Sequence, residues 1–295
     1  MDVRSVLKEK RPNLSDSSIT TYSSILRNLY KRCFPEHSEM TIEKFNDVHK
    51  ILEHLRDIPP SKRKTVLSAL VVLTNNKEYK ESMMSDISDY EKLMETNQKS
   101  ETQKENWLTY EQIIDVLKHL EDEAKLLYKK KHLTMTDLQS IQNYVILALL
   151  SGKYIAPRRS LDYCCMRVRN IKKNEDNWYD DKHFFFNKYK TAKYYHQQIV
   201  DIPPALRKIV DKWAKQNTHC DWLFFDNNSA PLTSVKLNQR LNKILGNGKA
   251  TNSCRHAYLC HKYGDTLKLN EDIKNTMTNM GSSQNMLGVY LKKDD

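Results

Sequence analysis

The residues whose types and order could do chemistry are one tyrosine, Tyr290, and two arginine segments upstream of it, Arg255 and the pair Arg158 and Arg159. A phenol that attacks a phosphodiester needs cations that never lose their charge, and arginine guanidinium groups supply them. Several lysines lie between the two arginine segments. The order arginine, lysine, arginine, tyrosine therefore predicts cleavage of a DNA strand.

Cleavage without metal or ATP requires three groups. A nucleophile attacks phosphorus in line, cations stabilise the charge on the non-bridging oxygens, and an acid protonates the departing 5′-oxygen. We expect Tyr290 to attack and to leave a 3′-phosphotyrosyl link, which stores the bond energy for religation. We expect Arg255 and one arginine of the 158–159 pair to hold the phosphate in bidentate fashion. A lysine in the segment 184–202 would be the acid.

Four short segments carry a family resemblance in the expected order. They are Ala-Pro-Arg-Arg-Ser-Leu-Asp-Tyr at 156–163, Lys190-Thr191, Asn252-x-x-Arg255, and Met-Gly-Ser-Ser at 280–283 ahead of Tyr290. Together they resemble the tyrosine recombinases, the phage-integrase superfamily, and look closest to the diverged branch found in eukaryotic viruses, virophages and related mobile elements. The resemblance covers residues 107–292 and implies a site-specific recombinase or integrase that closes around duplex DNA as a two-domain, C-shaped clamp.

The resemblance also assigns individual residues. The family places an acid three residues after its first arginine, which favours Arg159 with Asp162 and leaves Arg158, at a spacing of four, as the alternative. Lys190 best matches the family's hairpin lysine. Lys188 and Lys193 are rivals for that role, and all three lie where lysines would contact DNA. His256, next to Arg255, is an alternative catalytic residue.

Two positions depart from the family pattern. The second box usually begins with histidine and here begins with Asn252, and the histidine of the last box is replaced by Ser282. Both residues can donate a hydrogen bond to a phosphate oxygen, but neither can act as an acid or base near neutral pH. We therefore keep two roles open for the chain: slow catalysis, with Asn252 and Ser282 as hydrogen-bond donors, or DNA binding after loss of activity.

The composition points to a polyanionic partner. The chain of 295 residues carries 48 Lys+Arg and 37 Asp+Glu, a formal net charge of +11, and double-stranded DNA is the partner we expect. No GxxxxGK[ST] or GxGxxG sequence occurs, and neither an HExxH nor a CxxC motif is present, so we expect no nucleotide cofactor and no metal.

The six cysteines and the apolar segments bear on the compartment. The cysteines do not form a secreted-type framework, and the first residues contain no apolar signal core. No apolar stretch is long enough to span a bilayer. We expect an intracellular, reducing compartment, which for a viral protein would be the host nucleus or cytoplasm.

The elements that must position these groups are mainly α-helical, with one small antiparallel β-sheet. A stretch without apolar side chains, 95–106, separates a helical DNA-clamping domain at 1–98 from a catalytic domain at 107–295, with a linker at 99–106. Thr109 and Gln112 form a capping box. Helical periodicity and stop signals predict helices at 14–32, 41–57, from Ser61, at 134–151, 233–245, 252–263 and 270–280, and aromatic and β-branched residues predict the sheet within 164–202.

The helix that begins at Ser61 carries Lys62, Arg63 and Lys64 in its first turn. Cations are unfavourable at a helix N-terminus, so an external anion would help to explain them, and we expect contacts with DNA phosphates.

The resemblance leaves other functions open. Four protomers of a recombinase would exchange strands on DNA. A catalytically impaired DNA-binding protein of the same family would keep binding without cleavage. A topoisomerase of the tyrosine type would cleave as a monomer without a defined site. An RNA-binding structural protein is a more distant alternative, since no RRM, KH or zinc-knuckle pattern occurs.

Overall fold

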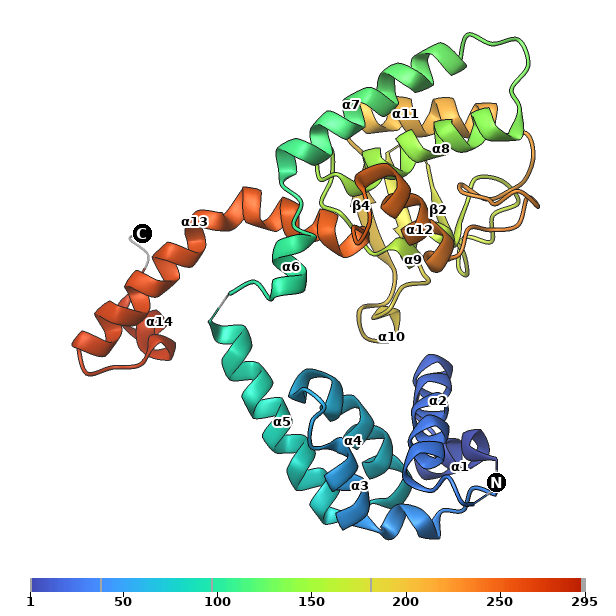
Figure 1. The fold of residues 1–295 in the computed structure, drawn as a ribbon. Helices are drawn as coiled ribbons and strands as arrows, with labels where there is room; N and C mark the ends of the chain where they lie inside the picture. The colour runs from blue at the N-terminus through green and yellow to red at the C-terminus, as the bar shows by residue number, and fades with distance from the viewer. Residues whose placement is uncertain (1, 38, 97, 181, 293–295) are drawn as a thin grey trace. The chain divides into compact units, whose positions relative to one another are not determined.

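The chain divides within the polar stretch 95–106. The computed structural model describes residues 2–37, 39–96, 98–180 and 182–292. The chain folds as two compact units, Met1–Ser100 and Glu101–Asp295, here called the N-terminal and C-terminal units (Figure 1). Both units are mainly helical, as the sequence predicts.

The N-terminal unit consists of helices alone in the part of the chain that the structure describes. Its elements are α1 (Val3–Lys10), α2 (Asp16–Cys33), η1 (Glu43–Asn46), α3 (Val48–Leu55), α4 (Pro60–Thr74) and α5 (Lys77–Glu95). The single helix expected at 41–57 is interrupted at Asp47, whose carboxylate accepts from the Lys50 amide and caps α3. Asp47 ends η1 and begins α3, because a short polar side chain competes for the backbone donors there.

Helix α4 is the centre of this unit. Pro60 stands at its first position, where the missing N–H is tolerated, and Leu67, Leu70 and Leu73 are fully buried against α1, α2 and α5. The hydroxyl of the buried Tyr79 donates to the Phe45 carbonyl at 2.8 Å and ties α5 to η1.

A buried ion pair joins α4 to α5. Asp86 is 1% exposed, and the Arg63 guanidinium donates to both of its oxygens, from Nε at 2.9 Å and from Nη2 at 2.6 Å. Arg63 also donates to the Arg56 carbonyl. Arg63 therefore has a partner inside its own unit, and its expected contact with phosphate stays a prediction.

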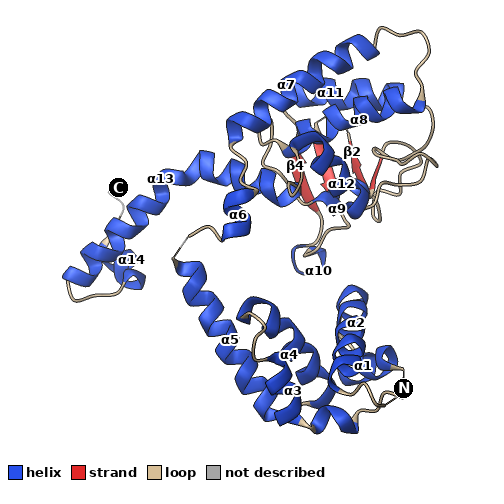
Figure 2. Ribbon diagram, viewed as in Figure 1, coloured by secondary structure: helices blue, strands red, loops and turns tan. Residues whose placement is uncertain are grey.

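The C-terminal unit is built around α8, in which 11 of 16 residues are buried and which packs against α7, α11 and α12. Both α7 and α8 begin with capping boxes, at Thr109 with Gln112 and at Thr134 with Asp137, so the predicted box at Thr109 is confirmed. Figure 2 shows the small sheet among helices that include α8, α9 and α12, with α13 leading away from it to α14. The helices are α6 (Glu101–Glu105), α7 (Tyr110–Leu127), α8 (Met135–Leu150), α9 (Ser160–Cys164), α10 (Ala192–Tyr195), α11 (Pro204–Gln216), α12 (Ser234–Leu245), α13 (Thr251–Asn279), η2 (Gln284–Met286) and α14 (Leu287–Tyr290).

The sheet within the described residues has four strands in the order β1 (Met166–Arg167), β2 (Asn177–Tyr179), β3 (His183–Phe186) and β4 (Gln198–Asp201). The expectation of an antiparallel sheet was wrong in one respect, because β1 pairs with β2 in parallel while the other two pairs are antiparallel. A strand of two residues has no alternation for the sequence to reveal. The Met166 carbonyl also accepts a hydrogen bond from the amide of Leu223. This residue is distant in sequence, and the bond helps to hold β1 in place.

Helix α13 spans the two predicted segments, 252–263 and 270–280, and is kinked between them. Tyr263 has a non-helical backbone, with φ −130° and ψ 15°, and precedes Gly264, so the predicted end of the first segment coincides with the kink. Figure 1 shows α13 leading from the region of the sheet to α14 at its far end.

The ion pair of Arg63 and Asp86 yields a stability prediction. Asp86→Ala removes the carboxylate that pairs with the Arg63 guanidinium and leaves this cation partly buried without a counter-charge. We expect a loss of about 3 kcal/mol in the free energy of unfolding. Hydrogen exchange of the α4 and α5 amides measures this for the N-terminal unit. Lys62→Ala, an exposed neighbour, is the control and should change exchange little. Equal exchange in Asp86→Ala and the control would contradict a structural role for the pair.

Candidate functional site

The pair Arg158 and Arg159 precedes the short helix α9, and the structure gives the two arginines different surroundings. Arg158 Nε donates to Asp162 Oδ2 at 2.8 Å, and its Nη2 donates to Gln198 Oε1 at 2.9 Å. The guanidinium carbon lies 4.0 Å from the centre of the Phe186 ring. Arg158 thus links α9 to strands β3 and β4.

Asp162 is the buried acid beneath these arginines, with 2% of its surface exposed. Burial raises the pKa of its carboxyl above the ordinary value, while the positive charges of the three neighbouring arginines, Arg158 first, act against that rise. The Asp162 carbonyl accepts from the Asn177 side chain at 2.8 Å, so α9 is also fixed to β2.

Arg159 and Arg255 face a common cavity of about 360 Å³, here called the arginine cavity. Among the residues that the structure describes, neither guanidinium donates a hydrogen bond or forms an ion pair. Two guanidinium groups without carboxylate partners beside one cavity form a site for a bidentate anion such as a phosphate. The cavity is lined by Ala156, Pro157, Arg158, Arg159, Asp162, Tyr189, Thr191, Tyr195, Gln198, Val200 and Arg255.

A glycine lets α13 approach the end of α8. Gly152 has φ +82°, and a Cβ built there would clash with the ring of Tyr258 on α13. A larger residue would therefore push α13 away and would carry Arg255 with it. Arg255, which is far in sequence from the adjacent Arg158 and Arg159, lines the same cavity because of this close packing.

The β3–β4 connection, residues 187–197, forms one wall of the arginine cavity through Tyr189, Thr191 and Tyr195. Lys190 and Lys193 are exposed on this connection and do not line the cavity. Lys188 pairs with the buried Asp176 at 3.3 Å. The structure thus places Lys190 next to a lining residue, and its role as acid stays a prediction.

Asn252 and His256 lie elsewhere. They line a separate cavity of about 260 Å³ near Trp107, whose ring centre is 6.3 Å from that of His256. Although Asn252 precedes Arg255 by one helical turn, Asn252 does not line the arginine cavity.

The Met-Gly-Ser-Ser segment ends α13. Gly281 has φ +69°, and the amides of Gly281 and Ser282 donate to the carbonyls of Thr278 and Met277, which is the Schellman pattern. Gly281 therefore has a structural role, because it adopts the left-handed conformation that ends the helix. Ser282 does not line the arginine cavity.

Tyr290 is the last residue of α14 and is 58% exposed. It is not among the residues that line the arginine cavity, and α14 packs on η2, which in turn packs on α13. The structure does not bring Tyr290 to Arg159 and Arg255.

The three cations predicted at the start of α4, Lys62, Arg63 and Lys64, have different environments. Lys62 is exposed, Lys64 Nζ lies 3.2 Å from the centre of the Tyr90 ring, and Arg63 is held by Asp86. The cluster is therefore not a uniformly solvated face.

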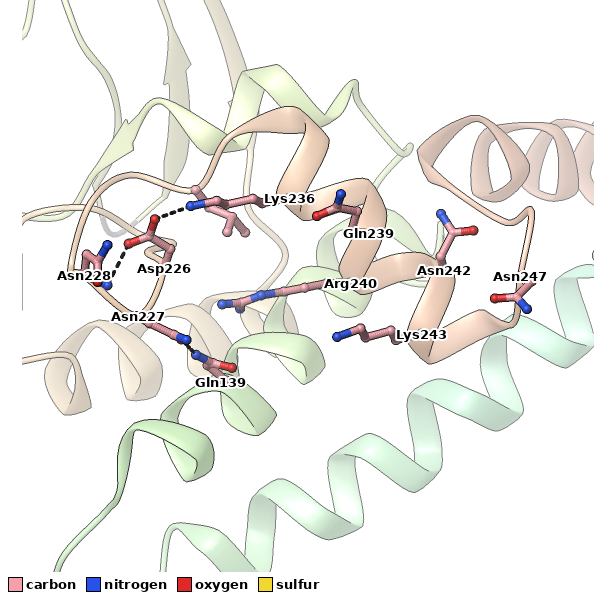
Figure 3. A pocket seen from close by; sticks show the side chains of 11 residues that line it. Gln139, Asp226, Asn227, Asn228, Lys236, Gln239, Arg240, Asn242, Lys243 and Asn247 are labelled. Atoms are coloured by element: carbon pink, nitrogen blue, oxygen red, sulfur yellow. Dashed lines mark hydrogen bonds and ion pairs between the residues drawn. The ribbon is translucent and has the colours of Figure 1, made fainter.

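A larger cavity, of about 760 Å³, lies along α12 and was not anticipated from the sequence. Figure 3 shows Arg240 and Lys243 extending from α12 toward Gln139 on α8. Lys236 pairs with Asp226 at 2.5 Å. Arg240 is half-buried and donates to two neutral oxygens, those of the Gln142 side chain and the Phe225 carbonyl. Its partial burial lowers its pKa. The signal in the sequence is the helical spacing of residues 236, 240 and 243 beside the buried Leu237, Leu241 and Leu245.

Metal-binding clusters and membrane-spanning helices are both absent from the described residues. Within 2–37, 39–96, 98–180 and 182–292, no group of three or more His, Cys, Asp or Glu residues is placed to hold a metal ion. No helix in the same residues has the length and apolar character needed to cross a membrane.

Comparisons with known proteins give little similarity. No protein-family model matches the chain, and no curated protein matches it. Among solved structures, the chain is similar to the crystal structure of XerA recombinase at 12% identity, over 100% of this chain and 94% of that one, with a TM-score of 0.35. A TM-score this low supports no conclusion about function, so a function has to be argued from the residues themselves.

The different surroundings of the two arginines predict different effects of substitution. Arg158→Ala should destabilise the C-terminal unit by about 3 kcal/mol at pH 7, because it leaves the buried Asp162 without its counter-charge. The loss should shrink in acid, because a protonated Asp162 carboxyl needs no counter-charge. Burial raises the folded pKa of Asp162, so this carboxyl favours the folded state below its unfolded pKa, and that contribution to stability is lost as the pH rises through its folded pKa. Urea unfolding at several pH values measures both.

Arg159→Ala is the matched variant. Because Arg159 has no such partner among the described residues, its replacement should change stability by no more than about 0.5 kcal/mol at any pH. Equal losses for the two variants would contradict the division between a held and an available arginine.

Proposed function

We propose that the protein cleaves and rejoins duplex DNA as a site-specific recombinase, through a 3′-phosphotyrosyl intermediate. The observation that carries the proposal is the arginine cavity, where Arg159 and Arg255 converge from segments far apart in the chain without carboxylate partners among the described residues. Cations arranged this way before a ligand arrives are suited to the charge that develops on a transferring phosphoryl group.

The proposed reaction exchanges one bond to phosphorus for another. The Tyr290 hydroxyl gives its proton to water, and its oxygen forms a bond to phosphorus while the bond from phosphorus to the 5′-oxygen of the next nucleotide breaks. The departing 5′-oxygen takes a proton, which Lys190 would donate. Arg159 and Arg255 hold the non-bridging oxygens throughout. Attack of a 5′-hydroxyl on the phosphotyrosine reverses each step and rejoins a strand.

Tyr290 has to reach the arginine cavity for this chemistry. The break at Tyr263 and Gly264 divides α13 between Arg255 and Tyr290, so a change of backbone angles there would redirect the distal half without disturbing the proximal half. A second copy of the chain is the other source of the tyrosine. Either route fits a tetramer in which activity waits for assembly on DNA.

The basic residues outside the cavity have a role in the same proposal. Lys62 and Lys64 of the N-terminal unit and Lys188, Lys190 and Lys193 of the C-terminal unit would contact phosphates as the two units close around the duplex as a clamp. The resemblance to integrases of viruses, virophages and mobile elements suggests integration as the biological reaction.

A catalytically impaired DNA-binding protein is the second candidate. The observation that favours it is the position of Asn252, Ser282 and Tyr290 outside the arginine cavity. A topoisomerase of the tyrosine type would share the cleavage chemistry but would need neither a defined DNA site nor a second copy of the chain.

Covalent trapping tests the proposal. A duplex selected by affinity from a random pool, prepared with nicks so that the released fragment diffuses away, should give an adduct that survives SDS without added metal. Mass spectrometry should place the DNA on Tyr290, and Tyr290→Phe should bind the same duplex normally without forming the adduct. Arg255→Ala should lower adduct formation on the order of 100- to 1,000-fold and binding far less.

Mixing variants identifies the source of the tyrosine. If Tyr290 comes from a second copy, a mixture of Tyr290→Phe and Arg255→Ala should recover adduct that neither variant forms alone. Tight binding with no adduct on any nicked duplex would instead support the impaired DNA-binding protein. An adduct on DNA without a defined site and without synapsis would support the topoisomerase.

The cavity along α12 predicts a salt-dependent contribution to binding. Lys243 lines this cavity and forms no ion pair within the described residues, so we expect it to meet a DNA phosphate. Lys243→Ala should reduce the slope of log affinity against log salt by about 0.9. Lys118→Ala, an exposed lysine of α7 that lines neither cavity, is the control. Equal slopes for Lys243→Ala and wild type would show that Lys243 and the cavity along α12 do not contact the DNA.

A further inference from the structure

The β3–β4 connection presents two adjacent tyrosines of similar exposure, and only one of them lines the arginine cavity. Tyr194 is 75% exposed and Tyr195 is 66% exposed, both on α10. Tyr195 lines the arginine cavity with Arg159 and Arg255, whereas Tyr194 does not. Among the described residues, no other aromatic ring stacks on Tyr195.

We propose that the Tyr195 ring stacks on a nucleobase that leaves the duplex stack beside the phosphate held in the arginine cavity. This inference rests on the proposed function, since it assumes that DNA occupies the cavity. It adds a positioning residue that fixes which nucleotide, and thus which phosphate, lies against the arginines.

The backbone that carries Tyr195 is held firmly. His196, the next residue, has φ +52° and ψ −152°, a conformation that residues other than glycine rarely adopt. Its amide donates to the Ala192 carbonyl at 2.9 Å, and its carbonyl accepts from the Tyr189 hydroxyl at 2.6 Å. These two bonds fix the turn at the end of α10.

The same tyrosine, Tyr189, connects this turn to the arginines. Tyr189 is buried, and its ring centre lies 5.5 Å from the guanidinium carbon of Arg158, which in turn is bonded to Asp162. The position of Tyr195 is therefore tied to the elements that form the cavity. A ring held at a fixed place beside a phosphate site suits stacking on one chosen base.

The charges around Tyr195 fit a nucleic-acid strand. Lys190 and Lys193 lie on the connection that carries this ring, are exposed, and form no ion pair within the part of the chain that the structure describes. An aromatic ring between cations that follow a phosphate backbone is a common way to bind unstacked bases, since every base has a face to stack. A duplex with all bases paired offers no such face, so one base has to move out.

A cycle of protein and DNA variants tests the stacking. The probe is the duplex selected for tight binding, with each nucleotide in turn replaced by an abasic tetrahydrofuran, and binding is measured in the Tyr290→Phe background. Tyr195→Ala should weaken binding to the intact duplex on the order of 10- to 100-fold. At one abasic position the same substitution should have no effect, because the base that stacks is already missing.

Two variants complete the test. Tyr195→Phe keeps the ring and should bind like the parent, and Tyr194→Ala, which removes a similarly exposed ring outside the cavity, should also bind like the parent on every duplex. Equal losses for Tyr195→Ala on intact DNA and on every abasic duplex would overturn stacking. So would weak binding by Tyr195→Phe, which would give the role to the hydroxyl.

Adduct formation separates this inference from the proposed function. If the otherwise unaltered chain forms the Tyr290 adduct and Tyr195→Ala changes neither binding nor adduct, only the stacking is overturned. If Tyr195→Phe abolishes the adduct while Tyr290→Phe keeps it, the Tyr195 hydroxyl is the reacting group and both assignments fail. No binding of DNA by the unaltered chain would overturn the proposed function and the stacking together.

Discussion

The buried carboxylate of Asp162 is the constraint on which the candidate site depends. A charge so far from water needs a counter-charge and hydrogen bonds. Arg158 supplies the counter-charge and one hydrogen bond, to Asp162 Oδ2, and it also bonds to Gln198 of β4 and packs over Phe186. One arginine is thereby used for structure. The next residue, Arg159, lies at the cavity wall, where its guanidinium group forms no hydrogen bond or ion pair with the described residues, and the close approach of α13 at Gly152 adds Arg255.

The arginine cavity contains the cations that would hold a phosphate, but it does not contain the groups that would react with that phosphate. Asn252 and His256 line another cavity, Ser282 takes part in the end of α13, and Tyr290 is exposed on α14. Separation of the nucleophile from the cations fits an enzyme that assembles its site only on DNA, and it also fits a protein that has lost cleavage. If the protein assembles its site only on DNA, the break in α13 at Tyr263 is where we expect the conformation to change.

Local signals in the sequence predicted much of the fold. The capping box at Thr109, the helix expected from Ser61, one residue after the observed start of α4, and the apolar periodicity of α8 each depend on neighbours within a turn or two of helix. The strand β1 is also held by a hydrogen bond from the amide of the distant Leu223, so its parallel pairing was not visible in the local sequence. For the site, spacing alone placed both arginines of the 158–159 pair near Asp162 but could not say which one pairs with it. The catalytic roles themselves stay predictions.

The measurement that tests the central claim most directly is neutralisation of single DNA phosphates. Methylphosphonate substitution, one position at a time, should weaken binding by the unaltered chain most at the phosphate held by the two arginines. In Arg159→Ala and in Arg255→Ala, the sensitivity at that one phosphate should be lost, and sensitivity elsewhere should remain. If the two variants lose sensitivity at different phosphates, or at none, the arginine cavity does not hold a phosphate of DNA.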